Sequence, residues 1–191
     1  MKKVIIIGAS GSLASYVVDE LQKFNDVHQT LFIRKKYRLS KSNFSNATIV
    51  EGDVMDYSKL KDAITGHDIV YVNLAGDLEP MAKNIVKAMK ETGVKRIIAI
   101  SSIGIYDEPV KPILLPYRKL ADVIHASGLD YTILRPDWFT NANEVNYAIT
   151  QKGEPETGKP ISRKSIASFV TSIIENPALH KNANLGISKP Q

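Results

Sequence analysis

The segment that most constrains the fold is the first turn of the chain, together with the residues on either side of it. Residues 3–7 (KVIII) form a run rich in β-branched side chains, and residues 8–11 (GASG) follow directly. Such a run predicts a strand buried on both faces, as in a parallel sheet. The next residues place Leu13, Val17 and Leu21 on one face of a helix. Because parallel strands need a crossover connection, this strand, turn and helix predict an α/β fold.

The same alternation of strand and helix continues along the chain. We predict strands at residues 3–7, 28–33, 47–50, 68–72, 96–101 and 131–134, with one more short strand within 145–150. We predict helices at residues 11–24, 59–64, 81–92, 118–126 and 163–176. Ser58 and Ser162 are the expected N-caps of two helices, and Pro80 is the expected first residue of a third. The pattern favours a single domain, residues 1–191, with a doubly wound parallel sheet and a short C-terminal addition.

Composition indicates a soluble globular protein. Hydrophobic residues make up 43% of the 191 residues and charged residues 24%. No apolar run approaches the roughly 18 residues of a membrane helix, and the run after Met1 is shorter than the core of a secretion signal. The absence of cysteine excludes disulfides, thiolate metal sites and a cysteine nucleophile. We therefore expect a cytoplasmic protein with no membrane partner, and its four scattered histidines predict no metal site.

The positive charge is concentrated in one segment. Arg34, Lys35, Lys36, Arg38 and Lys41 supply five positive charges within eight residues, and the net charge of the whole chain is also +5. The rest of the chain is therefore neutral, unlike a protein that spreads a basic face over nucleic acid. We expect no nucleic-acid partner. The segment is either a solvated loop or a local site for an anionic group.

The first turn has the residues that a nucleotide-binding turn requires. Gly8 permits a tight turn, Gly11 removes a Cβ where backbone must approach a pyrophosphate, and Ala14 lets the helix pack closely on the sheet. The free N–H groups at the start of the helix then face the phosphates. The alternative is a packing turn that needs only small residues.

The residue after the second strand indicates which nucleotide is bound. NAD-preferring sites place an acidic residue there to bind the ribose hydroxyls, whereas an arginine suits a 2′-phosphate. This chain has Arg34, followed by Lys35. Since a guanidinium is planar and always charged, it is well suited to a phosphate. The sequence therefore predicts NADP(H) as the cofactor.

Six segments in order, GASGSLA, LFIRK, EGDVMD, VNLAG, ISSIGIY and SGLDYTILRPDWFT, resemble the atypical short-chain dehydrogenases/reductases. Within them the chain is most similar to the NmrA-like, NAD(P)H-binding group that includes flavin and biliverdin reductases. The resemblance runs from Lys3 to about Thr140 and implies a Rossmann fold. The last predicted helix, SRKSIASFVTSII, is similar as well.

The resemblance implies a role for particular residues. The residues along the pyrophosphate would be Gly8, Ser10, Gly11, Ser12 and Leu13. The 2′-phosphate would lie at Arg34 and Lys35, and the adenine at Asp53 and Val54. The nicotinamide would lie at Leu74, Ala75 and Gly76. Ser102, at the end of the fifth strand, matches the catalytic serine of the family and stands four residues before Tyr106, as in extended members.

The chain departs from the family at the proton relay. The superfamily uses Tyr-x-x-x-Lys, in which the tyrosine donates a proton and the lysine lowers its pKa. Aligned on residues 127–129, the tyrosine position falls on Ile113 and the lysine position on Tyr117. Lys119 comes two residues late and should face elsewhere on the helix. Tyr117 is then either a proton donor or ribose ligand, or a packed aromatic side chain. Flavin reduction tolerates this loss, because hydride passes directly between two positioned rings.

Two further segments carry alternatives. Residues 153–159 (GEPETGK) match the spacing of an ATP-binding loop, but Pro160 stands where magnesium binding needs Ser or Thr, so we expect no ATP site. Trp138 and Phe139 either close the core as loop aromatics or form a wall of the substrate pocket beside the nicotinamide.

Together these features predict an NADPH-dependent oxidoreductase that transfers hydride to a small acceptor: a flavin, a quinone or a carbonyl compound. The alternative is a non-catalytic NADP(H)-binding redox sensor of the NmrA type, which the missing Tyr-x-x-x-Lys favours. The compact chain favours the enzyme. No helix has an excess apolar face, so we expect a monomer or a weak homodimer.

Overall fold

The computed structural model describes residues 1–39 and 47–191. Its main sheet has eight strands in the order β3-β2-β1-β4-β5-β6-β10-β8. These strands are β1 (Lys2–Ile7), β2 (Val27–Ile33), β3 (Ala47–Glu51), β4 (Ile69–Val72), β5 (Arg96–Ile100), β6 (Asp130–Pro136), β8 (Ala148–Gln151) and β10 (Ala183–Ser188). All neighbours are parallel except β8, which runs antiparallel to β10. The chain order reverses between β1 and β4, which is the topological switch point of a doubly wound sheet.

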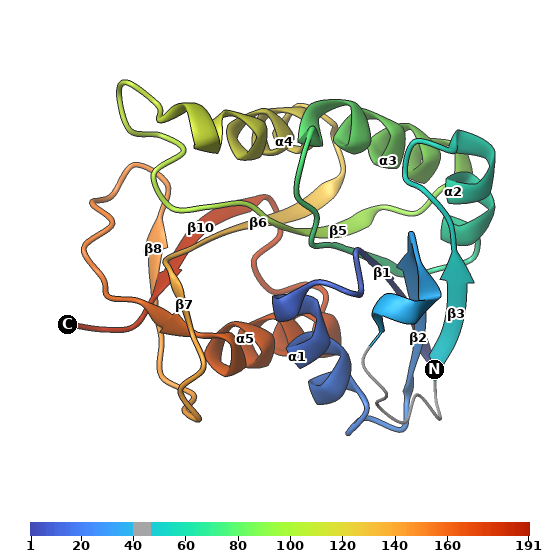
Figure 1. Ribbon diagram of the computed structural model, residues 1–191, viewed down its shortest axis with the longest axis horizontal. Coiled ribbons are helices and arrows are strands. Elements are labelled where there is room, and N and C mark those ends of the chain that lie inside the picture. Colours follow the sequence, from blue (N-terminus) through green and yellow to red (C-terminus); the bar gives the residue numbers. More distant parts are fainter. Residues whose placement is uncertain (40–46) are drawn as a thin grey trace.

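The α-helices of the described residues cover the two faces of the sheet (Figure 1). One face carries α1 (Ser12–Leu21) and α5 (Arg163–Glu175), and the other carries α2 (Tyr57–Ile64), α3 (Leu78–Thr92) and α4 (Leu115–His125). Short 3-10 turns, η1 (Lys36–Arg38) and η2 (Pro112–Leu114), precede β3 and α4. None of the helices in residues 1–39 and 47–191 is long and apolar enough to cross a membrane. The predicted α/β doubly wound fold is confirmed.

Strand β1 shows why the sheet lies at the centre of two cores. Val4 and Ile6 belong to the apolar cluster under α1 and α5, whereas Ile5 and Ile7 belong to the cluster under α2, α3 and α4. All four side chains are fully buried. Successive strand residues face opposite sides of a sheet, so a strand covered on both faces must be apolar at every position.

Three predicted helix starts are wrong. Helix α4 begins at Leu115, three residues before the predicted start at residue 118. Helix α2 begins two residues earlier than predicted, and its N-cap is Asp56, whose carboxylate accepts from Lys59 N at 3.2 Å. Ser58 lies inside the helix. Helix α3 begins at Leu78, so Pro80 is its third residue and not its first. Proline is tolerated there because the first four helical N–H groups have no partner within the helix.

The C-terminal part of the sheet contains elements that the sequence did not predict. Strand β10 pairs in parallel with β6, and the strand predicted within residues 145–150 lies at β8, on the other side of β10. A second small sheet joins β7 (Phe139–Thr140) to β9 (Ile161–Ser162). The sequence of β10, ANLGIS, lacks the β-branched run of the inner strands, which is why it was missed.

Candidate functional site

A cavity of about 810 Å³ extends along the carboxyl edge of the sheet. It is formed by the segments that follow β1, β2, β3, β4, β5 and β6, together with the start of α4. Most of the predicted site residues line it: Gly8, Ser10, Gly11, Ser12, Leu13, Arg34, Asp53, Val54, Leu74, Ala75, Ser102 and Tyr117. The fold therefore gathers residues that are more than a hundred positions apart, from Gly8 to Tyr117, as expected at the switch point of an α/β sheet.

The turn between β1 and α1 tolerates no side chain at its first position. Gly8 has φ +87°, and a Cβ there would lie 2.1 Å from the backbone oxygen of Asn73. Gly11 is the N-cap of α1 and carries no side chain that could bond the first helical N–H groups. The turn thus brings uncapped N–H groups to the cavity, as an anion-binding helix terminus requires.

The segment after β2 brings two arginines to the cavity. Arg34 and Arg38 line it, whereas Lys35 does not. Lys35 has extended backbone angles, so its side chain leaves the chain on the side opposite to its neighbour's. Arg38 was missed as a site residue, although it belongs to the basic segment that the sequence singled out. Lys41, in the same segment, lies outside the described residues.

The segment after β3 forms the next part of the wall. Asp53 is exposed, and its Oδ1 accepts from the backbone N of Met55 at 2.8 Å. Val54 is buried. Gly52 also lines the cavity, and a Cβ there would lie 2.8 Å from the ring of Phe32. The segment after β4 lines the cavity through Leu74 and Ala75. Gly76, which was also predicted to belong to the site, does not line the cavity and lies in an exposed turn with φ +110°.

At the other end of the cavity Ser102 and Tyr117 come together from β5 and α4. The Ser102 hydroxyl donates to the carbonyl of Ile103 at 3.1 Å, and that of Ser101 donates to the carbonyl of Tyr117 at 3.0 Å. Tyr117 is half-buried and packs against the apolar cluster under α4. This placement is compatible with a proton donor or ribose ligand and also with a packed aromatic side chain, since Tyr117 packs on the core and lines the cavity.

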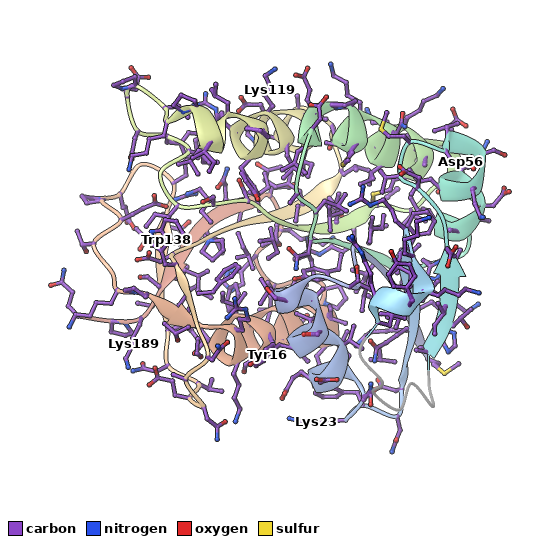
Figure 2. The ribbon with its side chains drawn as sticks, in the orientation of Figure 1. Tyr16, Lys23, Asp56, Lys119, Trp138 and Lys189 are labelled. Carbon is purple, nitrogen blue, oxygen red and sulfur yellow. The ribbon has the colours of Figure 1, made fainter. Side chains whose placement is uncertain are left out.

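Lys119 takes no part in this site. Its Nζ lies 2.8 Å from Glu79 Oε2, and Figure 2 shows it on the outer side of α4. The hydrogen bonds from Lys119 and Lys83 lower the pKa of Glu79 to about 2. Ile113, at the tyrosine position of the family, is an exposed apolar side chain at the rim. The tyrosine and lysine of Tyr-x-x-x-Lys are therefore missing from the sequence, and Lys119 does not replace the lysine at the cavity.

The segment after β6 forms the far wall of the cavity through Pro136, Asp137, Trp138 and Phe139. Trp138 is 80% exposed, so the interpretation that it closes the core is wrong. Figure 2 labels it at the left of the view, among the strands there. An exposed indole at a cavity offers a flat apolar surface to a bound ring.

Tyr106 does not line the cavity. Its hydroxyl accepts from Asn184 Nδ2 at 2.7 Å, and burial raises its pKa. Arg118, Arg135 and Lys152 place their cationic groups within 5.3 Å of the centre of its ring. The position that extended members of the superfamily share is used here for contacts with α4, β6 and β10.

The sequence matches the NAD(P)H-binding family over residues 8–177, which is most of the chain. The chain belongs to the NAD(P)H-binding family. The match begins at Gly8, the glycine that has no room for a Cβ. Since the family binds NAD(P)H, the cavity with its uncapped helix terminus and two arginines is the natural place for that cofactor, and the residues present fit it.

Solved structures of the NAD(P)H-binding family and its relatives share the whole fold. A Rossmann-fold NAD(P)-binding family protein from Shigella flexneri is 43% identical, with a TM-score of 0.92, and the alignment covers 100% of this chain and 94% of that one. A short-chain dehydrogenase/reductase from Veillonella parvula, solved in complex with NADP, is 25% identical with a TM-score of 0.90, over 99% of this chain and 95% of that one. The resemblance to atypical short-chain dehydrogenases/reductases is thereby confirmed.

Curated relatives include proteins named as reductases. The phenylcoumaran benzylic ether reductase IRL1 of Ginkgo biloba is 27% identical over 83% of this chain and 54% of its own length. An isoflavone reductase homolog of Nicotiana tabacum, A622-like, is 28% identical over 92% of this chain and 64% of its own length. The chain thus spans between half and two thirds of the length of these plant relatives.

Proposed function

We propose that the protein is an NADPH-dependent reductase that transfers hydride to a small flat acceptor: a flavin, a quinone or a carbonyl compound. The observation that carries the proposal is the continuity of one cavity from the glycine turn to Trp138. Its volume of about 810 Å³ lies within the range of sites that enclose small ligands. A cavity that served only to hold a nucleotide would need no wall beyond Ala75.

The residues of the first half would hold the cofactor. The N–H groups at the start of α1 would bind the pyrophosphate, and Arg34 and Arg38 would bind the 2′-phosphate. Asp53 and Val54 would flank the adenine. When bound, NADPH supplies a hydride. The structure of the Veillonella relative with NADP supports this choice of nucleotide.

The residues of the second half would position the acceptor. The acceptor takes up a hydride and a proton, and NADP⁺ is left. Tyr117 can supply the proton when the acceptor is a carbonyl compound, because a tyrosine hydroxyl can donate and this residue lines the cavity. A flavin needs no such group, because its reduction depends mainly on the relative placement of two rings. The missing lysine therefore favours a flavin over a carbonyl compound.

A second candidate is the non-catalytic redox sensor. Lys119 is paired to Glu79 on the outside of α4, and Ile113 occupies the tyrosine position. A sensor would bind NADP(H) in the same cavity without turnover.

A panel of acceptors distinguishes the two candidates. The protein is incubated with NADPH and, separately, with riboflavin, menadione and an aromatic aldehyde, and the absorbance of the reduced nicotinamide is followed. Loss of absorbance with any acceptor supports the reductase. Tight binding of NADPH with no turnover of any acceptor overturns it in favour of the sensor.

The preference for NADPH over NADH is tested by Arg34→Asp. We expect this variant to lose affinity for NADPH by at least about tenfold and to gain relative affinity for NADH, because an acid repels the 2′-phosphate and accepts from ribose hydroxyls. Lys35→Asp is the matched control. It makes the same charge change one residue away, outside the cavity, and should shift both affinities little. Equal affinity of the unaltered protein for NADH and NADPH would refute the assignment.

A further inference from the structure

The strongest unexplained group in the cavity is Asp137, which directly follows β6. It is only 9% exposed, yet it lines the cavity. The backbone around it is fixed on both sides. Its own N–H donates to Ile187 O at 3.0 Å, and the N–H of Ile103 donates to Pro136 O at 3.1 Å. The second bond places Asp137 against the Ser102–Gly104 segment, in the acceptor half of the cavity.

Among the described residues, one oxygen of this carboxylate accepts a hydrogen bond and the other accepts none. Asp137 Oδ1 accepts from the backbone N of Trp138 at 2.6 Å. Within residues 1–39 and 47–191 no ion pair involves Asp137, and no donor bonds its Oδ2. Oδ2 is not among the buried polar atoms of those residues that lack a partner, so it retains open surface. A nearly buried carboxylate thus offers one free oxygen at the wall of the cavity.

The free oxygen of Asp137 restricts which ligands can form a hydrogen bond with it. An ionised carboxylate only accepts hydrogen bonds, so a ligand that reaches it must donate one. A ring that carries an N–H on its edge meets this demand, whereas a ring that presents only carbonyl oxygens places acceptor against acceptor. A ligand of the second kind would also strip water from Oδ2 without replacing its hydrogen bonds, which is costly.

We propose that Asp137 determines which acceptor the protein takes: a flat ring with an N–H donor on its edge, such as the imide of a flavin, in preference to a quinone. The proposal rests on the reductase function and narrows its acceptor class. Trp138, next in the chain and exposed at the same wall, would cover the face of the ring while Asp137 bonds its edge.

The test uses the only tryptophan of the chain as its reporter. With NADP⁺ present at saturation, lumiflavin, 3-methyllumiflavin and menadione are each titrated, and quenching of Trp138 fluorescence gives their dissociation constants. The two flavins differ only in that a methyl group replaces the imide hydrogen. We expect lumiflavin to bind at least about tenfold more tightly than 3-methyllumiflavin, since a hydrogen bond to a charged group is at stake.

Asp137→Asn supplies the second half of the test. The side-chain oxygen of asparagine can still accept from Trp138 N, but its amide group presents a donor where the free oxygen stood. We expect the preference for lumiflavin to fall to about threefold or less and menadione to bind more tightly than before. Asp107→Asn is the control, since Asp107 is an exposed carboxylate at the same cavity and its loss should leave the ratio of the two flavins unchanged.

The outcomes separate this proposal from the reductase proposal. Equal binding of lumiflavin and 3-methyllumiflavin to the unaltered protein would overturn the role of Asp137, even if both are reduced. An undiminished preference in a folded Asp137→Asn protein would overturn it as well. Preferential binding of lumiflavin without any oxidation of NADPH would uphold the role of Asp137 in binding and refute the reductase.

Discussion

Glu156 is the carboxylate that pairs with the buried Arg135 in the described part of the chain, and its replacement by glutamine should destabilise the protein and loosen one wall of the cavity. The Arg135 side chain is 1% exposed, and its Nε lies 2.8 Å from Glu156 Oε1. The other oxygen, Oε2, accepts from the backbone N of Gly104 at 3.2 Å. The carboxylate therefore ties the loop after β8 both to β6 and to the turn that carries Ser102 and Gly104.

The expected loss follows from counting donors and acceptors. Arg135 Nε and Gly104 N are both donors, so each needs an acceptor, and a glutamine has only one oxygen. Its NH₂ group would face one of the two donors. Removal of one partner of a buried ion pair costs about 3–5 kcal/mol, and the 18% exposure of the Glu156 side chain places this pair at about 3 kcal/mol. For a chain of this size such a loss lowers Tm by about 6–12 °C.

The measurement compares two variants from the same loop. Glu154→Gln is the control, because Glu154 is exposed and its Oε2 accepts only from the nearby Gln151 N at 2.8 Å. Thermal unfolding should show a Tm loss of about 2 °C or less for the control, as is usual for a surface change. Hydrogen exchange should accelerate at Gly104 in Glu156→Gln alone. Equal Tm values for the two variants, with unchanged exchange at Gly104, would refute the reasoning.

Three further changes test other parts of the structure. Gly8→Ala should weaken NADPH binding by about a hundredfold or more, measured by calorimetry, because its Cβ would lie 2.1 Å from the Asn73 oxygen at a positive φ; unimpaired binding would remove the turn from the site. Tyr117→Phe should lower carbonyl reduction by about a hundredfold while scarcely changing flavin reduction, and full activity of both Tyr117→Phe and Ser102→Ala on every acceptor would make these residues structural. Burial lowers the pKa of His67, so below pH about 6.5 the unfolded chain takes up a proton that the folded chain does not, and stability is lost as pH falls; His67→Gln should remove this part of the loss when Tm is measured between pH 7 and 5, and an unchanged slope would contradict it.

Much of the half of the cavity that we propose for the cofactor could be predicted, because the sequence features that indicate it lie close together in the chain. A β-branched run, a glycine without room for a Cβ and a helix without a side-chain cap lie within a few residues of one another, at residues 4–14. Parallel strands end at a common edge, so the order of the motifs already predicted which segments would meet. The choice between Lys35 and Arg38 was not predictable, because it depends on the direction that each side chain takes in the turn η1.

The half of the cavity that we propose for the acceptor depends on contacts between distant segments of the chain. The sequence left two alternatives open for Trp138, of which the place in the core is wrong, and it did not single out Asp137, because burial and the partners of a carboxylate depend on the residues that pack around it. In the same way residues 153–159 match the spacing of a phosphate-binding loop, but in the structure Glu156 pairs with Arg135 and accepts a hydrogen bond from Gly104 N.

The sequence by itself determined the order of strands and helices from β1 to β6, the glycine turn after β1 and the basic residue after β2, since apolar periodicity and glycine geometry act over a few residues. Only the tertiary structure decided the place of β10 beside β6, the pairing of Lys119 with Glu79 and the free oxygen of Asp137. The physical reason is that hydrogen bonds, ion pairs and burial join groups that are close in space and distant along the chain.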